Sequence, residues 1–149
     1  KRLWSGGGYD NSNAKQAVHV QLAYLYSRLN LGQARPDLNS TLAFIRLLNI
    51  GNRVFNQISS ADWTRRSAEV GLSAFASKDA VTTPDLVYAL SSKILQQDLA
   101  AVFELYGLPV SSAARQSVAA LGLPVAGLPE PTKDHAQSAL EMALAATEA

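Results

Sequence analysis

Apolar residues recur along the chain at steps of three and four, and no stretch shows the strict alternation of apolar and polar positions that marks a strand. The pattern over residues 13–30 predicts a first helix. Ser12 precedes it with the chemistry of an N-cap, and Gly32 follows it with that of a left-handed C-cap. Its expected apolar face consists of Ala14, Val18, Leu22, Leu25 and Leu29.

The next two predicted helices cover residues 38–56 and 61–76. Gly51 lies inside the first of them, where glycine costs about 1 kcal/mol relative to alanine, so a break at this position stays open. The expected buried stripe of residues 38–56 contains Leu42, Ile45, Leu48 and Phe55, widened by Phe44 and Leu47. Residues 61–76 have Ser59 or Ser60 as the predicted cap, an apolar set of Trp63, Val70, Leu72 and Phe75, and a polar face with Arg65, Arg66 and Glu69.

Start signals for a fourth helix, over residues 84–95, follow closely. Thr83 is the predicted N-cap, Pro84 fits the first helical position, and Asp85 suits the first turn. The expected apolar face of this helix contains Leu86, Val87, Leu90 and Ile94.

A short fifth helix is predicted over residues 99–106, with Asp98 as its cap. Leu99, Val102, Phe103 and Tyr106 share its apolar face. Gly107 is expected to end it with a positive φ, and Pro109 prevents its continuation. Ser111 or Ser112 then caps a sixth helix that runs to Leu121, ahead of Gly122.

Together these helices predict an all-α fold, an irregular bundle of six or seven short helices. The helical domain is expected over residues 12–122, after a flexible leading segment, residues 1–11, with three consecutive glycines. Residues 123–131 form a predicted proline-rich linker or surface arm. Residues 132–149 form a last amphipathic helix with a thin, alanine-rich apolar face.

Composition narrows the range of functions. Only 17% of the residues are charged, below the usual quarter, which indicates extensive burial or surfaces that another protein covers. The net charge of +1 and the scattered basic residues argue against a nucleic-acid partner. No apolar run is long enough to span a membrane. Cysteine is absent, which excludes disulfides and thiolate metal sites, and a first residue other than Met predicts a processed product or a piece of a larger protein.

No motif in the chain carries a recognisable reaction, so we predict no catalytic, cofactor-binding or metal-binding residue in it. The two histidines, His19 and His135, are 116 positions apart and lack the H-E-x-x-H spacing of a zinc peptidase, and His19 is expected to be hydrogen-bonded beside an apolar face. Residues 71–75, GLSAF, depart from the G-x-S-x-G nucleophile pattern at the last position. The glycines of residues 6–8 lack the context of a phosphate loop.

The remaining polar and aromatic side chains have ordinary structural interpretations. The carboxylates are expected at helix starts or on solvent faces: Asp62, Glu69, Asp79, Asp85, Asp98 and Glu104. The aromatic residues are expected in the core. A sharper alternative is that Tyr24 or Tyr26 lines a cleft shared with a domain outside this chain.

Residues 90–111, LSSKILQQDLAAVFELYGLPVS, resemble the C-terminal helical region of the M60-like (enhancin-type) zinc metallopeptidases. The matching positions are Ser91 or Ser92, Asp98, Leu99, Phe103, Gly107, Pro109, Val110 and Ser111. Tyr106 stands where that family more often has Trp. The likeness extends over about residues 13–124, because residues 13–26 look like a helix that follows the active site in such enzymes.

The resemblance implies a scaffold subdomain below a catalytic cleft, in a secreted or cell-surface enzyme that cuts glycosylated, mucin-like proteins. The family's zinc ligands and general base would precede this region, so zinc is expected in the parent enzyme and no cofactor in this chain. The implied partner is the catalytic half of the parent. Two alternatives stay open: a stand-alone helical protein-interaction module, whose partner is another protein, and a small-molecule-binding bundle.

Overall fold

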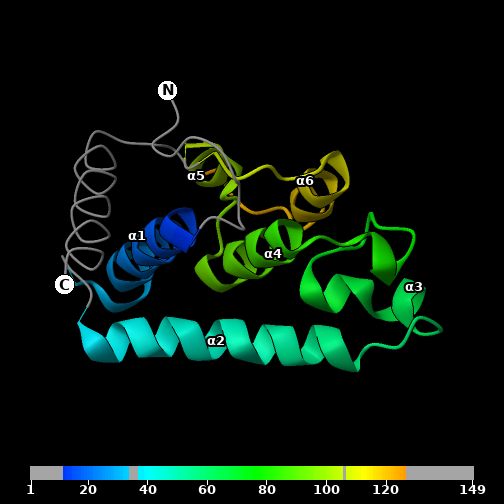
Figure 1. The fold of residues 1–149 in the computed structure, drawn as a ribbon, viewed down its shortest axis with the longest axis horizontal. Helices are drawn as coiled ribbons and strands as arrows, with labels where there is room; N and C mark the ends of the chain where they lie inside the picture. Colours follow the sequence, from blue (N-terminus) through cyan, green and yellow to red (C-terminus); the bar gives the residue numbers. More distant parts are fainter. Residues whose placement is uncertain (1–11, 34–36, 106, 127–149) are drawn as a thin grey trace.

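The computed structural model describes residues 12–33, 37–105 and 107–126, and for residues 12–20 the backbone alone. The described residues form six α-helices and two short 3-10 helices, without a strand, so the predicted all-α bundle is confirmed (Figure 1). The α-helices are α1 (Ser12–Leu31), α2 (Leu38–Gln57), α3 (Trp63–Arg66), α4 (Thr83–Leu95), α5 (Ala100–Leu105) and α6 (Ser112–Ala119), and the 3-10 helices are η2 (Ser67–Val70) and η3 (Lys78–Ala80). The predicted segments 1–11 and 132–149 lie outside the described residues.

Helix α4 is the centre of the bundle. It packs against α1, α2 and α6, and in Figure 1 it lies between α2 and the pair α5 and α6. Every residue from Asp85 to Ser92 is buried, as expected of a helix with neighbours on all sides. Tyr88, Ala89 and Leu90 contribute to a core that also holds Trp63, Phe44, Phe103, Leu22, Ile58, Leu72, Leu99 and Leu108.

Helices α2 and α4 cross at Gly51. A β-carbon on Gly51 would lie 2.6 Å from Leu90 Cδ2, so the absence of a side chain permits the close approach. The break that the sequence left open at Gly51 does not occur, because α2 is one continuous helix. An interhelical contact therefore accounts for this glycine.

The inward face of α2 differs from the predicted stripe. Phe44 and Leu48 are buried, as expected, and Phe55 is half-buried. The prediction was wrong for Leu42, Ile45 and Leu47, whose exposed fractions are 38%, 39% and 37%. Phe44 and Leu48 lie on the same side of α2 as Gly51, where Phe44 packs against Tyr26 of α1, and the other three residues turn toward solvent.

The predicted helix over residues 61–76 is shorter and less regular than expected. Helix α3 ends at Arg66, η2 continues to Val70, and Gly71 ends the element with a φ of 73°. Beyond Gly71 the chain turns back, and Phe75 O accepts a hydrogen bond of 2.8 Å from the Trp63 indole N–H. Ser59 accepts from the backbone N–H of Asp62, which makes it the turn residue before α3.

Most of the other predicted helix ends are confirmed. Gly32 has a φ of 65° after α1. The cap of α4 is Thr82 and not Thr83, because the Thr82 hydroxyl accepts from the backbone N–H of Asp85. Pro84 still lies in the first turn, as predicted. Helix α4 ends at Gln96, whose left-handed φ of 57° the sequence did not indicate.

Candidate functional site

The stretch that resembles the metallopeptidase family forms a junction between helices, which we call the Asp98 junction. It consists of Asp98 with its hydrogen-bond partners from α4, α5 and residues 124–126. The Asp98 side-chain Oδ1 accepts from the backbone N–H of Ala100 at 3.1 Å and from the Tyr88 hydroxyl at 2.6 Å. One carboxylate oxygen therefore caps α5, as predicted, and also holds α4.

The Asp98 backbone adds two more hydrogen bonds to the junction. Its N–H donates to Pro124 O at 2.8 Å, and its carbonyl accepts from the Ala126 N–H at 2.9 Å. Ala126 is buried, with an exposed fraction of 5%. Pro124 and Ala126, in the first part of the predicted proline-rich linker, are thus hydrogen-bonded to the helical domain through Asp98. Residues 127–131 of the predicted linker lie outside the described part.

Tyr88 has its phenol in the interior of the junction. Burial raises the pKa of Tyr88 far above its usual value, and the hydrogen bond to the negatively charged Asp98 raises it further. The Tyr88 ring also packs edge-on against Phe103, with the ring centroids 5.6 Å apart. The phenol therefore stays protonated and serves as a hydrogen-bond donor to Asp98.

The glycine–proline stop after α5 has the predicted geometry. Gly107 has a φ of 70°, and the Leu108 N–H reaches back to Phe103 O at 2.9 Å. Leu108 is buried, which anchors the turn in the core, whereas Pro109 is exposed. Tyr106 lies outside the described residues.

A second carboxylate, Asp85, connects α4 to α6. Its Oδ1 accepts from the Ser111 N–H at 2.8 Å, and its Oδ2 accepts from the Ser111 hydroxyl at 2.9 Å. The same hydroxyl caps α6 by accepting from the Ala114 N–H at 3.1 Å, as predicted for Ser111. Asp85 lies in the first turn of α4, as predicted, but its exposed fraction is only 1%, and Ser111 supplies its hydrogen bonds.

Two more serines join elements in the same way. Ser92 Oγ accepts from the Leu99 N–H at 3.3 Å, so Ser92 contributes to the junction between α4 and α5. Ser117 Oγ accepts from the Ala74 N–H and donates to Ala113 O, which connects α6 to the loop after η2. Ser92 and Ser117 thus each connect two elements of the fold.

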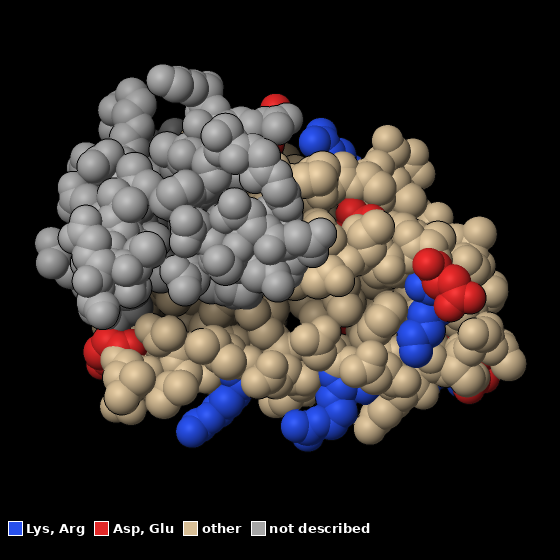
Figure 2. All heavy atoms as spheres, in the orientation of Figure 1, with Lys and Arg blue, Asp and Glu red and all other residues tan. Residues whose placement is uncertain are grey.

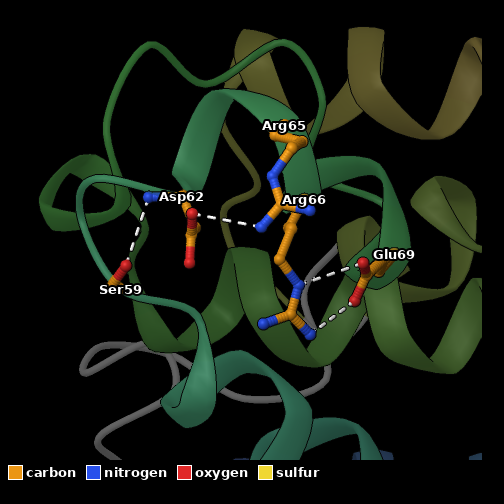
Figure 3. Close-up of polar contacts among 5 residues, drawn as sticks. All are labelled: Ser59, Asp62, Arg65, Arg66 and Glu69. Carbon is orange, nitrogen blue, oxygen red and sulfur yellow. Dashed lines mark hydrogen bonds and ion pairs between the residues drawn. The ribbon is translucent and has the colours of Figure 1, made fainter.

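The basic pair at the end of α3 has carboxylate partners within one turn. Arg65 contacts Asp62 at 3.1 Å, and Arg66 contacts both carboxylate oxygens of Glu69 at 3.1 and 2.9 Å (Figure 3). Hydrogen bonds from the two arginines lower the pKa of Asp62 and of Glu69, and Glu69 raises the pKa of Arg66. This pair therefore does not form an anion-binding cluster.

The sequence singled out two histidines and two tyrosines as possible site residues, and the structure describes only the tyrosine side chains. His19 and His135 lie outside the residues whose side chains are described. Within the described part, His, Asp and Glu form no group of three that could hold a metal ion, and no helix is long and apolar enough to cross a membrane. Tyr24 is buried, and the half-buried Tyr26 packs its ring against Phe44 at 5.8 Å.

Among the described residues, several polar side chains connect one element to another, and these connections were only partly visible in the sequence. Asp98, Gly107 and Ser111 were predicted from local capping and turn chemistry. The pairing of Asp85 with Ser111 across 26 positions had no local signal. The chain matches no known protein-family model, no curated protein and no solved structure.

Proposed function

We propose that this chain is a helical scaffold subdomain of a secreted M60-like zinc metallopeptidase acting on glycosylated, mucin-like proteins, and that it is inactive on its own. The observation that supports this proposal most directly is the Asp98 junction. The residue that carries much of the family resemblance joins α4, α5 and residues 124–126 through four hydrogen bonds. A residue used in this way fixes the relative positions of helices, which is what a scaffold role requires.

The other matching residues fit the same role. Gly107 makes the turn that lets Leu108 enter the core, and Ser111 caps α6 while it binds Asp85. In this proposal the zinc ligands and the general base belong to the catalytic half of the parent, upstream of this chain. The helices would hold that half in place from below its cleft.

The test begins with the coding sequence upstream of Lys1. We expect an H-E-x-x-H motif within the preceding few hundred codons, and its absence from that reading frame would remove the proposal. In the parent enzyme, Asp98→Ala should lower the melting temperature but leave zinc content and kcat of the folded enzyme unchanged. Loss of kcat at a temperature where the variant is fully folded would contradict a scaffold role.

A second candidate function, a stand-alone protein-interaction module, is favoured by one observation. Of the large apolar residues that are exposed in the described part, five lie on α2, which is unusual for a surface helix. Size-exclusion chromatography and thermal melting of the chain alone separate the two candidates. A monomer with a cooperative melt supports the module, and aggregation supports a subdomain severed from its parent.

A further inference from the structure

The outward surface of α2 combines apolar side chains with unpaired basic ones. Leu38, Leu42, Arg46 and Ile50 follow one another at steps of four, so they form one ridge along the helix. Leu38 is 73% exposed and Ile50 is 53% exposed. Ile45 and Arg53 flank this ridge at steps of three, and we call these six residues the α2 ridge.

The charges of the α2 ridge have one sign. Helix α2 contains Arg46 and Arg53, both exposed, and it contains neither Asp nor Glu. No carboxylate of the described residues lies within ion-pair distance of either arginine. Figure 2 shows basic side chains projecting from the lower edge of the molecule, where α2 runs, with uncharged side chains between them.

The combination of exposed apolar residues and two arginines on the α2 ridge favours some binding partners over others. A second copy that docked through the same ridge would add two more arginines and no carboxylate to the interface, and such an excess of one charge opposes association. A membrane surface would have to take up arginines that stand within the apolar ridge, whereas helices that lie on membranes keep their charges on a separate polar face. A protein segment with apolar side chains flanked by carboxylates could bury its apolar side chains against those of the ridge and pair its carboxylates with Arg46 and Arg53.

We infer that the α2 ridge is a docking surface for an amphipathic helix whose apolar stripe is flanked by Asp or Glu. The inference rests on the proposed function, in which the chain works through contact with another protein unit, and it adds the chemistry of that contact. Leu38, Leu42, Ile45 and Ile50 supply the apolar area, and the two arginines fix the orientation of the partner by pairing with its carboxylates.

The test uses two synthetic helical peptides of about 21 residues with the same leucine stripe. One carries Glu at the flanking positions and the other carries Lys at the same positions. Titration of the chain, followed by NMR amide shifts, should show binding of the Glu peptide at the α2 ridge, about tenfold tighter than the Lys peptide, as two exposed ion pairs imply. Raising the salt concentration from about 0.05 M to about 0.5 M should reduce this difference.

Two variants locate the site, and one serves as the matched control. Leu42→Glu combined with Ile45→Glu should abolish binding of the Glu peptide, because both side chains are exposed and belong to the ridge. Arg46→Glu combined with Arg53→Glu should reverse the preference toward the Lys peptide without changing the core. Gln116→Glu combined with Ala119→Glu places the same two charges, three positions apart, on exposed residues of α6, so binding should be unchanged.

Several outcomes would overturn the inference. These are equal binding of the two peptides, equal loss in the Gln116 and Ala119 variant, self-association of the chain that the Leu42 and Ile45 variant abolishes, and stronger binding to phosphatidylserine vesicles than to the Glu peptide. None of them bears on the upstream H-E-x-x-H motif or on Asp98→Ala in the parent. Failure of the docking surface and failure of the proposed function are therefore distinguishable.

Discussion

The carboxylates of Asp85 and Asp98 accept hydrogen bonds from residues of neighbouring elements. Asp85 receives both polar hydrogens of Ser111, and Asp98 receives those of Tyr88 and Ala100. A hydrogen bond to a charged acceptor is stronger than one between neutral groups. If the acceptor is removed, the buried donor has no partner, and this lowers the stability of the fold. These aspartates therefore hold the relative positions of α4, α5 and α6.

Replacement of Asp98 by alanine should destabilise the fold substantially. Loss of the α5 cap costs about 1 kcal/mol, and leaving the buried Tyr88 hydroxyl without its acceptor costs about 1–3 kcal/mol. We expect a total loss of about 2–4 kcal/mol in the free energy of unfolding, measured with urea. The control is Glu104→Ala, which removes an exposed carboxylate from α5 itself, and an equal loss in both variants would show that the junction contributes nothing specific.

The raised pKa of Tyr88 predicts that the free energy of unfolding falls in alkaline solution. The pKa of this phenol is raised in the folded state above the unfolded value of 10.0, so the folded protein keeps a proton that the unfolded chain releases. Its contribution is complete below about pH 10 and is lost progressively as the pH rises above that value. Urea midpoints between about pH 9 and pH 11.5 should fall more steeply for the natural chain than for Tyr88→Phe.

A matched variant separates this effect from the titration of other groups. Phe55→Leu changes a half-buried aromatic residue that packs against Trp63 and has no titratable group, so its alkaline slope should equal that of the natural chain. If Tyr88→Phe also kept the full slope, the buried phenol would not be its source.

Helix boundaries were largely accessible from the sequence, but helix orientations were not. Gly32, Gly107 and Ser111 end or begin helices through backbone chemistry that depends only on near neighbours. Helix α2 has apolar residues on every side, so periodicity alone does not determine which ones face the core. The deciding feature is Gly51, which marks the face that approaches Leu90.

Other discrepancies have the same physical origin, since they depend on contacts between elements. The short α3 follows from the return of the chain to the Trp63 indole, and the left-handed Gln96 connects α4 to the Asp98 junction. The burial of Asp85 depends on Ser111, 26 positions later. The partners in the contacts of Trp63 and Asp85 are far apart in the sequence, so no short motif around either residue indicates the contact.

The contact of α2 with α4 predicts that Gly51→Ala is destabilising. Alanine improves helix propensity by about 1 kcal/mol, but its β-carbon at 2.6 Å from Leu90 Cδ2 forces a core rearrangement that costs about 1–3 kcal/mol. We expect a net loss of up to about 2 kcal/mol in urea unfolding. The exposed neighbour Asn52, changed to alanine, reports the propensity gain alone.

A double-mutant cycle gives the sharper form of this prediction. In a Leu90→Ala background the clash disappears, and the added methyl group fills part of the new cavity, so Gly51→Ala should become stabilising. Additive effects of the two substitutions would show that Gly51 has no role in the helix crossing.

At the scale of the whole molecule, the described helices form a bundle around α4, and apart from Asp85 their described charged side chains are exposed or half-buried. Asp85 to Ser92 of α4 are enclosed, and the ion pairs Asp62–Arg65 and Glu69–Arg66 are on the surface. In Figure 2 most of the visible surface belongs to uncharged side chains. Such a surface is suited to contact with another protein, which is consistent with the proposed role of the α2 ridge.

The surface carboxylates also determine the response to acid. A backbone hydrogen bond from Ser40 lowers the pKa of Asp37 below its reference value of 3.8, and Arg66 lowers that of Glu69 below 4.5. A folded pKa below the unfolded one gives stability that is present above the unfolded value and is lost as the pH falls through the folded value. The melting temperature should therefore be nearly constant from about pH 8 to pH 5 and fall below about pH 4.

The contribution of Glu69 is small because the residue is exposed and salt screens its ion pair, but it has a distinct signature. The stability difference between the natural chain and Glu69→Gln should be largest near neutral pH and shrink as the pH falls below 4.5 and through the lowered pKa of the folded state. Asp79→Asn is the matched control, since Asp79 is exposed and forms no ion pair with a described residue. A difference for Glu69→Gln that persisted unchanged at pH values near 2 would place the effect in packing and not in the charge pair with Arg66.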